Sequence, residues 1–319
     1  MKSAQKAKTS ELSTGRGFWR TLWHDVIRDR YLYLMLLPCL AYYIIFHYFP
    51  MYGLQIAFKD YNMFTGIKDS AFVGMTHFIR FFQSPDFGRV LKNTILISLY
   101  SLAVGFTAPI IMALLLNEVR CRKFRSGVQT VIYIPHFISM VVVAGLVVNF
   151  LSPSYGLVNM IIERLGGEKI YFMMEPKYFK TIYVLMNAWK ETGFATIVYV
   201  AALTSVDMQL YEAAMLDGAG RWKQTLYVTI PSILPTIITM LIMRIGNMLL
   251  LGYEGIILLY QPSTYETADI ISSFVYRSGI LETQYSFAAA VDLFNGVISL
   301  ILVVGANIIS RKLTETSLW

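Results

Sequence analysis

Six long apolar blocks, separated by polar connections, dominate the pattern of this 319-residue chain. An α-helix needs about 20 apolar residues to cross the hydrocarbon layer of a membrane, and each block is roughly that long. The layer offers no water to backbone groups, so helices are the structure that such blocks favour. The predicted spans are Tyr31–Ala57, Leu91–Leu116, Val128–Leu151, Thr181–Leu203, Pro231–Leu251 and Phe287–Ser310. The expected fold class is therefore all-α, a polytopic membrane protein with six transmembrane helices.

A polar insert between the fourth and fifth blocks carries its own helix signals. Asp207 is a residue type that caps helix N-termini, and Met208–Leu216 consists mostly of good helix formers. Gly218 marks the end, because glycine readily adopts the left-handed conformation that closes helices. We therefore expect a helix over 208–216. A second short helix is expected over 221–228, ending before the proline that begins the fifth block.

The first of these helices needs a packing partner, since its nine residues are too few to stay helical alone in water, where about 12–15 are marginal. Leu210, Ala213, Ala214 and Asp217 recur at helical spacing and share one face. The paired alanines let another backbone approach closely, and Glu212 lies off this stripe, free to meet a donor. One interpretation is a docking helix for a partner outside the membrane. The other is a plain surface helix that links two spans.

Basic residues cluster in the N-terminal tail, the second-to-third connection and the C-terminus. The clusters are Lys2, Lys6, Lys8, Arg16, Arg20, Arg28 and Arg30; Arg120, Arg122, Lys123 and Arg125; and Arg311 and Lys312. With six spans all three regions fall on one side, which the positive-inside rule assigns to the cytoplasm. The polar insert then lies there too. This asymmetry explains much of the net charge of +7, so nucleic acid is not an expected partner, whereas membrane lipid is.

The composition excludes an ordinary soluble protein, with 56% apolar and only 15% charged residues. The first apolar block is too long for a cleaved signal and is expected to stay as a span. Cys39 and Cys121 do not suggest a disulfide framework. The sequence has no Gly-x-x-x-x-Gly-Lys-Ser/Thr phosphate loop and no His-Glu-x-x-His pair. We therefore predict no catalytic residue, no metal ligand and no cofactor in this chain.

Charged residues lie deep inside three of the blocks, where a charge costs about 2.5–3.5 kcal/mol at a helix centre. Lys190 and Glu191 interrupt the fourth block, and Arg244 lies inside the fifth. Such residues usually face a cavity or a partner. Asp292 in the sixth block is the natural partner for Arg244, with Glu254 and Glu191 as further candidates. The alternatives are charges that reach the outer interface and an ion pair that merely locks two helices together.

Polar and aromatic residues near these charges could line a translocation path. A stripe of polar and small residues runs along the sixth block: Asp292, Asn295, Gly296 and Ser299. We hypothesise that this stripe faces the path. Trp189, Asn187 and Tyr199 could offer a ligand an aromatic face and hydrogen-bonding edges. Packing is the more common use of such residues in a chain that is 14% aromatic.

The insert resembles, position by position, the cytoplasmic EAA loop of ABC-importer permeases. The matching residues are Glu212-Ala213-Ala214, Asp217-Gly218-Ala219, Ile230-Pro231 and Leu234-Pro235. In that family the loop forms the coupling helix, which sits in a cleft of the ATPase and transmits nucleotide-driven motion. The resemblance implies the following ATPase-coupling residues: Glu212, Ala213, Ala214, Asp217, Gly218 and Ala219.

The wider segment from about Leu91 to Leu313 looks like the membrane domain of binding-protein-dependent carbohydrate importers, in the lipoprotein- or polysaccharide-type permease branch. The pieces that carry this resemblance include Leu91-Lys92-Asn93-Thr94, Leu115-Leu116-Asn117-Glu118, Tyr133-Ile134-Pro135-His136, Trp189-Lys190-Glu191-Thr192-Gly193-Phe194 and Val275-Tyr276-Arg277-Ser278-Gly279. It implies half of a pathway for an oligosaccharide or polysaccharide fragment, and Trp189, Asn187 and Tyr199 then become candidates for binding the sugar. The candidate path residues are Trp189, Lys190, Glu191, Arg244, Asp292 and Asn295.

The resemblance also implies partners and a layout. The partners are ABC ATPase subunits that hydrolyse ATP, a second and non-identical permease, and an extracellular solute-binding protein, assembled in a bacterial cell membrane. The expected layout is a basic cytoplasmic tail (1–30), a transmembrane permease domain (31–313, core about 91–313) and a cytoplasmic tail (314–319). The coupling loop covers 204–230, and both termini are expected in the cytoplasm.

Two other functions stay open at this point. One is an ion-coupled secondary carrier that uses the intramembrane charges, and the other is a non-transporting scaffold that recruits a cytosolic partner through the insert. The single cytoplasmic insert and the lack of a visible internal duplication favour the importer over the carrier.

Overall fold

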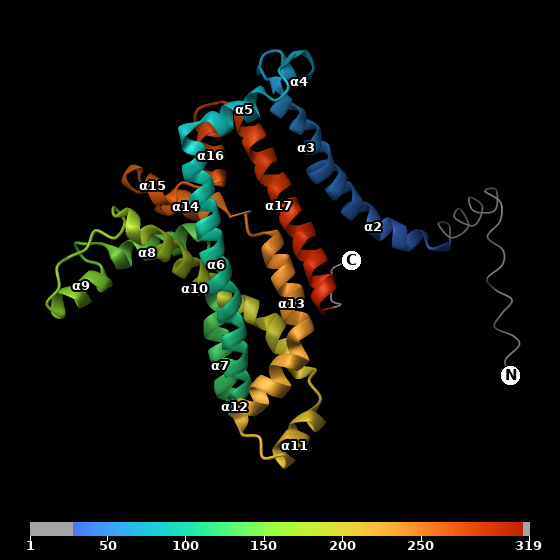
Figure 1. The fold of residues 1–319 in the computed structure, drawn as a ribbon, viewed down its shortest axis with the longest axis vertical. Coiled ribbons are helices and arrows are strands. Elements are labelled where there is room, and N and C mark those ends of the chain that lie inside the picture. The colour runs from blue at the N-terminus through green and yellow to red at the C-terminus, as the bar shows by residue number, and fades with distance from the viewer. Residues whose placement is uncertain (1–27, 250, 315–319) are drawn as a thin grey trace, which may run out of the picture. The chain divides into compact units, whose positions relative to one another are not determined.

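The computed structural model describes residues 28–249 and 251–314, which are largely helical (Figure 1). The chain divides into two compact units, 1–55 and 56–319. Most of the expected N-terminal tail and residues 315–319 of the C-terminal tail lie outside the described residues. The first unit contains α2 (Arg30–Tyr43), the π-helical turn η1 (Ile44–Tyr48), α3 (Phe49–Met51) and the start of the 3-10 helix η2 (Tyr52–Phe58). Within this chain α2, η1 and α3 bury no residue.

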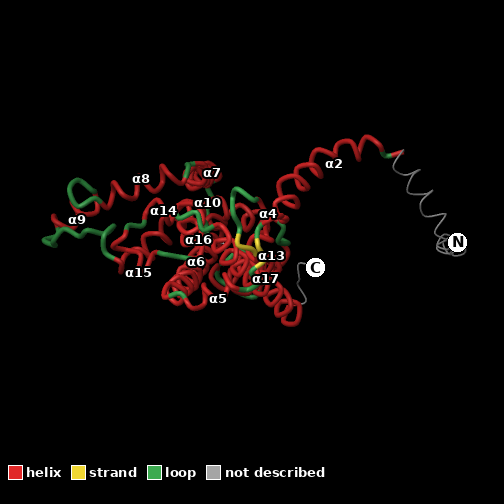
Figure 2. Tube along the Cα trace, turned by 90° about the horizontal axis from the view of Figure 1, so that it is seen from above, coloured by secondary structure: helices red, strands yellow, loops and turns green. Residues whose placement is uncertain are grey.

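The second unit opens with a small hairpin and a short amphipathic helix. Its first elements are β1 (Lys59–Asp60), α4 (Gly66–Asp69), β2 (Ala71–Phe72) and α5 (Thr76–Gln83). The two strands pair antiparallel, with Lys59 opposite Phe72 and Asp60 opposite Ala71; Figure 2 shows them in yellow.

Helices make up the rest of the second unit. They are α6 (Pro85–Glu118), α7 (Arg122–Tyr133), η3 (Ile134–Phe137), α8 (Met140–Leu151), α9 (Leu157–Arg164), α10 (Pro176–Thr204), α11 (Met208–Leu216), α12 (Arg221–Gln224), η4 (Thr225–Thr229), α13 (Ile230–Gly246), α14 (Tyr253–Leu259), η5 (Pro262–Thr264), α15 (Tyr265–Ala268), α16 (Ile271–Tyr276), η6 (Arg277–Leu281) and α17 (Tyr285–Thr314). Within this unit α11 and α12 lie at one end, and α5 and α16 lie at the other (Figure 1).

Within the described part of the chain, four helices are each long and apolar enough to cross a membrane. They are Arg30–Phe58, Pro85–Glu118, Arg221–Gly246 and Tyr285–Arg311. These coincide with the first, second, fifth and sixth expected spans. Two bent helix pairs also qualify if each pair counts as one span, which would bring the total to six. The fourth expected span lies within one of these pairs, entirely inside α10.

The third expected span is broken rather than continuous. The helix that ends with η3 meets α8 at an angle of 102°. Pro135 lies in η3, where its missing N–H weakens helical bonding, and Ser139 then starts a new helix by accepting a hydrogen bond from the Val142 N–H at 3.4 Å. A proline followed by a good N-cap therefore turns one apolar block into two helices.

The expectation of a separate second helix over 221–228 is wrong. α12, η4 and α13 form one helical run of 26 residues, Arg221–Gly246. Pro231 lies inside this run as the second residue of α13, shortly after the π-helical stretch Thr225–Thr229. A π-helical turn shifts the hydrogen-bonding pattern, so the run continues past a residue that has no N–H to donate. The run also ends at Gly246, five residues earlier than the expected end of the fifth span.

The core of the second unit lies where α6 and α10 pack against each other and against shorter helices. One cluster joins α6, α8, α10 and α14, and its members include Ile97, Val143, Tyr183 and Ile256. A second, largely aromatic cluster joins α5, α6, α16 and α17 and includes Phe81, Phe274 and Phe287. These clusters hold the long helices in place between the two ends of the unit.

Candidate functional site

The coupling loop, residues 204–230, carries the expected helix with the expected caps. α11 begins after Asp207, whose side chain accepts a hydrogen bond from the Gln209 N–H at 2.9 Å. It closes at Gly218, which has φ +74°, and the Ala219 N–H bonds back to the Ala214 carbonyl oxygen at 2.9 Å. The structure therefore contains both of the helix caps that the sequence predicts for α11.

Three contacts hold α11 and the following turn against the long helices. The hydroxyl groups of Tyr211 and Thr229 lie 2.9 Å apart, which links α11 to η4. The Gln224 side chain donates to the Ala219 carbonyl oxygen at 2.7 Å. At the base of the loop the guanidinium of Arg221 pairs with Glu118, the last residue of α6, at 3.1 Å. The loop is therefore connected to both α13 and α6.

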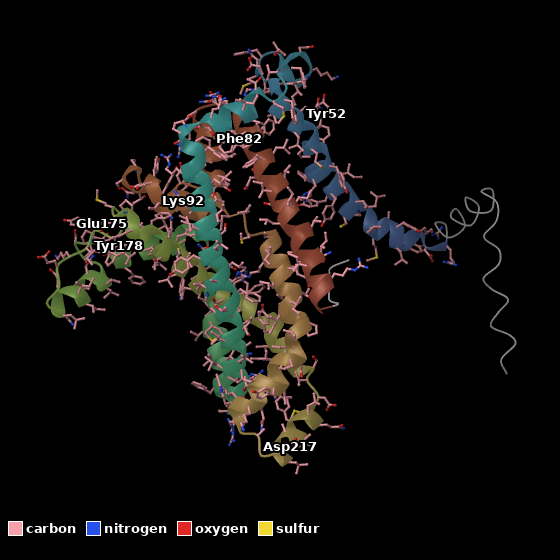
Figure 3. The ribbon with its side chains drawn as sticks, viewed as in Figure 1. Tyr52, Phe82, Lys92, Glu175, Tyr178 and Asp217 are labelled. Carbon is pink, nitrogen blue, oxygen red and sulfur yellow. The ribbon has the colours of Figure 1, made fainter. Side chains whose placement is uncertain are left out.

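The coupling residues inferred from the sequence form an open surface. Of the six, Ala214 and Ala219 are half-buried and the other four, Glu212, Ala213, Asp217 and Gly218, are exposed. Figure 3 labels Asp217 at the tip of the unit. Large apolar side chains beside them are also uncovered: Leu216 is 90% exposed and Trp222 74% exposed. An apolar surface of this kind on a charged loop fits a protein partner.

The charges inside the fourth block contact each other and the break in the third. The Lys190 ammonium group is buried; it donates to the His136 carbonyl oxygen at 2.8 Å and lies 3.3 Å from Glu191. Glu191 in turn contacts Nδ1 of His136 at 2.8 Å, and the imidazole stacks on Phe194 with ring centres 4.0 Å apart. These contacts connect α10 to η3. Lys190 and Glu191 therefore both have hydrogen-bond or ion-pair partners within the protein.

Gly193 lies within this contact region. A Cβ atom at this position would overlap the carbonyl oxygen of Ile132 in α7. α10 runs through Gly193 without interruption, so the glycine serves a close backbone approach between two helices.

The expected ion pair between Arg244 and Asp292 does not occur among the described residues. Arg244 instead points toward Gly105 of α6, where a Cβ would lie 2.9 Å from its guanidinium. It lines a cavity of about 220 Å³ with Glu191 and Asn187. Asp292 lines a different cavity. The reason is tertiary: α13 ends two residues after Arg244, which leaves this side chain on the side of α6 and α10.

A second cavity of about 390 Å³ also reaches Arg244, from the side of Ser98 and Asn247. The buried hydroxyl oxygens of Ser98 and Ser101 face these cavities and have no hydrogen-bond partner within the described part of the chain. No acidic side chain there makes an ion pair with Arg244 either. This arrangement offers a guanidinium and two hydroxyl groups to a ligand, while the Glu191 carboxylate in the same lining is already paired with Lys190 and His136.

The remaining path candidates are dispersed. Trp189 is exposed and borders an apolar cavity of about 360 Å³ between α8 and α10, and Tyr199 packs in the core. Asn187 alone of the three sugar-binding candidates reaches the Arg244 cavity. The stripe on α17 divides: Asp292 and Gly296 are exposed, whereas Asn295 and Ser299 are buried.

Sequence reasoning missed an ionic cluster near the opposite end from the coupling loop. Asp269 is completely buried and receives Arg277 at 2.7 Å and Arg89 at 3.3 Å. Burial opposes charge on Arg277, but hydrogen bonding and the charge of Asp269 raise the pKa of this arginine above its ordinary value. Asn93 also donates to the Asp269 carbonyl oxygen, at 3.2 Å. Arg277 is only eight residues from Asp269, but Arg89 is 180 residues away, so the sequence gives no local signal for the cluster.

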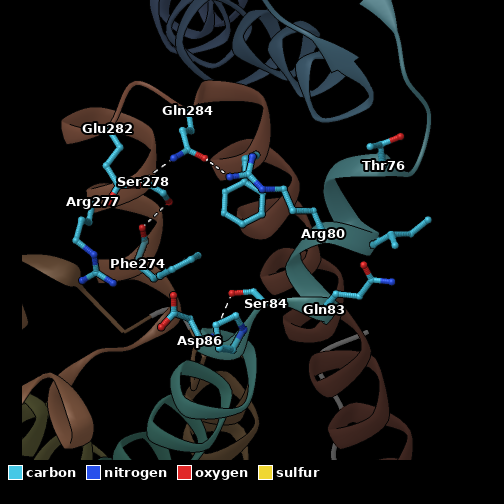
Figure 4. Close-up of a pocket in the computed structure, with 13 residues that line it drawn as sticks. Thr76, Arg80, Gln83, Ser84, Asp86, Phe274, Arg277, Ser278, Glu282 and Gln284 are labelled. Carbon is cyan, nitrogen blue, oxygen red and sulfur yellow. Dashed lines mark hydrogen bonds between the residues drawn. The ribbon is translucent and has the colours of Figure 1, made fainter.

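A polar cavity of about 620 Å³ lies beside this cluster, between α5 and the α16–α17 connection. In Figure 4 the Arg80 guanidinium reaches Gln284, at 2.8 Å, and Asp86 lies below with Ser84. Asp86 also pairs with Arg89 at 2.6 Å, so the charges of the cavity are largely tied to the scaffold. The polar contacts around the cavity join α5 to the η6–α17 connection and tie the first turns of α6 together.

Comparisons with known proteins agree with this arrangement of long helices. The chain is 45% identical over 294 residues to the polygalacturonan/rhamnogalacturonan transport system permease protein YteP of Bacillus subtilis, covering 92% of each chain. It is 42% identical over 316 residues to protein LplB of the same species, covering 99% of this chain and 98% of LplB.

A solved structure with a similar fold supports the same relationship. A chain in the crystal structure of a bacterial ABC transporter involved in the import of the acidic polysaccharide alginate is 48% identical, with a TM-score of 0.85 over 92% of this chain and 99% of that chain. Residues 105–315 match the model of one family, the binding-protein-dependent transport system inner membrane components. The chain belongs to this family and is a multi-pass membrane permease subunit of an ABC transporter.

Proposed function

We propose that the chain forms one half of the translocation pathway of an ATP-driven importer for acidic oligosaccharides. Two of its relatives are named for polygalacturonan/rhamnogalacturonan transport and for import of the acidic polysaccharide alginate. The observation that carries the acidic preference is Arg244, a half-buried guanidinium that borders two cavities and has no ion pair among the described residues.

The proposed partners follow the related systems. The alginate transporter has been crystallised with an alginate pentasaccharide-bound periplasmic protein. By analogy this chain receives sugar from an extracellular solute-binding protein, pairs with a second permease and docks on ATPase subunits. Six spans with both termini in the cytoplasm fit the basic clusters and put the coupling loop on the ATPase side.

The coupling loop would transmit motion of the ATPase to the long helices α13 and α6. Glu212, Ala213 and Asp217 would lie in the ATPase cleft, with Leu216 and Trp222 at its edges. Because α11 is bonded to η4 and the loop to α6, displacement of the docked helix moves α13 and α6 together. Arg244 lies on α13 and faces α6, so the proposed sugar site lies between the two helices that the ATPase would move.

Arginine suits the proposed substrate. Its planar guanidinium binds a carboxylate through two parallel hydrogen bonds. The hydroxyl groups of Ser98 and Ser101 and the amide of Asn187 would then meet the hydroxyl groups of the same sugar ring. A carrier driven by ions would have to use the titratable groups of the path, such as Glu191 and Asp292. The family membership and the coupling loop favour the ATP-driven mechanism.

Purification and reconstitution test this proposal. We expect the tagged chain, purified gently from its native membrane, to bring along an ATPase and a second permease. The double variant Glu212→Ala/Gly218→Pro should lose the ATPase and keep the permease. The coupling-loop assignment would be contradicted by a chain that purifies alone, or by an ATPase that co-purifies equally well with the wild type and the double variant.

Uptake by the reconstituted complex tests the substrate class. With ATP inside the vesicles and binding protein outside, trigalacturonate should accumulate without an ion gradient. Arg244→Gln should lower uptake at least tenfold while the ATPase still co-purifies, whereas the matched control Arg164→Gln, an exposed arginine on α9, should transport normally. Uptake that continues without ATP and collapses with the ion gradient would favour the carrier.

A further inference from the structure

A third cavity in the second unit has a different chemistry from the one at Arg244. It measures about 470 Å³ and is formed by α14, α16, η6 and α17. Its polar and aromatic lining includes Tyr253, Tyr276, Tyr285, Asp292 and Asn295. Leu251 borders both this cavity and the two at Arg244, so the sites are neighbours separated by the segment that follows α13.

A buried acceptor without a hydrogen-bond partner belongs to the lining of this cavity. Asn295 is only 1% exposed. Its amide nitrogen donates to the Leu249 carbonyl oxygen at 3.4 Å, but its Oδ1 atom has no partner among the described residues. Buried amide oxygens nearly always accept a hydrogen bond, so a ligand that brings a donor would complete this group.

The aromatic side of the cavity suits a sugar ring. Tyr253 and Tyr276 stack on each other with ring centres 5.3 Å apart and planes 14° apart. Each ring keeps one face free of the other, and both line the cavity. Aromatic faces combined with a polar rim bind flat, amphipathic ligands, and the C–H face of a sugar ring is such a surface.

The charge of the cavity defines which sugar it accepts. Asp292 is the single ionisable acid or base in its described lining, apart from the tyrosine hydroxyls. The carboxylate accepts hydrogen bonds from sugar hydroxyls and repels a second carboxylate. An exposed carboxylate on a membrane-spanning helix also requires a polar surrounding. The ligand must therefore be rich in donors and free of negative charge.

We propose that this cavity is a subsite for an uncharged, hydroxyl-bearing sugar ring, next to the Arg244 site for an acidic ring. The inference rests on the proposed importer function and deepens it. An oligosaccharide that passes Leu251 would present neutral and acidic residues to sites of opposite preference. The substrate class is then an oligosaccharide that contains both kinds of residue, rather than one built of uronic acids alone.

Binding of two probes to the whole complex tests this subsite. The complex in nanodiscs is titrated with neutral galactotriose and with trigalacturonate, and binding is followed by saturation-transfer NMR. We expect Tyr276→Ala to weaken galactotriose binding at least tenfold and to leave trigalacturonate within twofold. Arg244→Gln should do the reverse. Tyr155→Ala, an exposed tyrosine outside the cavity, serves as the control.

Asp292→Asn provides a second variant that conserves shape on an exposed side chain. It should relieve repulsion and let trigalacturonate bind several-fold more tightly, and retention of the ATPase on purification reports that each variant is assembled. The inference is overturned if galactotriose fails to bind the wild type. It is also overturned if neither Tyr276→Ala nor Asp292→Asn changes the affinity of the complex for galactotriose. ATP-driven uptake of trigalacturonate by the same complex reconstituted into closed vesicles would then leave the importer function standing.

Discussion

Gly193 sets the distance between α10 and α7 through a missing side chain. The α7 backbone occupies the space where a Cβ would lie, and Lys190 and Glu191 on the preceding turn bond to η3 in the same region. A sequence with a charged pair next to a glycine looks like a kink or a polar site in a membrane helix. In the structure the glycine lets α10 pack closely against α7, and the charged pair bonds to His136 in η3, where the third apolar block bends.

Gly193→Ala should therefore destabilise the protein. Overpacking of this kind typically costs about 1–3 kcal/mol, and the clash with backbone leaves no flexible side chain to move. We expect a lower midpoint of thermal unfolding in detergent and poorer recovery of the complex. The matched control is Gly145→Ala in α8, where nothing lies within 4 Å of the added Cβ, so stability should hold or rise slightly. Equal midpoints for the two variants would refute the close-approach argument.

At the scale of elements, α11 shows how a nine-residue helix persists outside a membrane. Its amino end is capped by Asp207, its carboxyl end closes on Gly218, and the hydroxyl pair of Tyr211 and Thr229 ties it to η4. The caps are encoded locally, while the tie to η4 depends on how α12 to α13 fold into a single helix. Both are needed because propensity alone would not maintain so short a helix.

Asp207→Ala should loosen this helix and weaken coupling. Loss of an N-cap typically costs about 0.5–2 kcal/mol of helix stability, and a frayed α11 would fit the ATPase less well. We expect a several-fold fall in transport per ATP hydrolysed by the reconstituted complex. Asp207→Asn should behave like the wild type, because asparagine caps as well as aspartate. If both variants transport alike, the cap does not matter for coupling.

At the scale of the whole molecule, charged side chains form a buried cluster in one region and an exposed pair in another. Near the end opposite the coupling loop, Asp269 is buried between Arg89 and Arg277 and fixes the α15–α16 segment on α6. Toward the coupling loop, Arg221 and Glu118 form an exposed pair, which contributes only modestly to stability. Basic side chains around α7 remain solvated and fit a cytoplasmic face.

Cysteine labelling tests the proposed orientation. Cys121, exposed just before α7, should react with a membrane-impermeant maleimide in inside-out vesicles and stay unlabelled in intact cells. Cys121 is tested in a Cys39→Ser background, and an introduced cysteine is tested with both Cys39 and Cys121 replaced by serine. Phe64→Cys, placed at a 97% exposed position in the β1–β2 connection, should show the opposite pattern. Labelling of Cys121 from outside would reverse the topology and remove the coupling loop from the ATPase side.

Local sequence signals were enough to predict the all-helical membrane class, most of the long apolar helices and the helix over 208–216 with both its caps, whereas the coupling role of this helix stays a prediction. Those features depend on local quantities: the length of an apolar run, the preference of Asp207 for a cap and the freedom of Gly218 to adopt positive φ. The resemblance to ABC-importer permeases rested on the same stretch, and the comparisons confirmed it.

Only the tertiary structure decided which polar groups meet. It separated Arg244 from Asp292, placed them in neighbouring cavities and joined Asp269 to arginines on other helices. It also bent the third span and merged the predicted helix at 221–228 into α13. The physical reason is that a side chain's partner depends on where its helix ends, rotates and packs, and these properties arise from contacts between residues far apart in the chain.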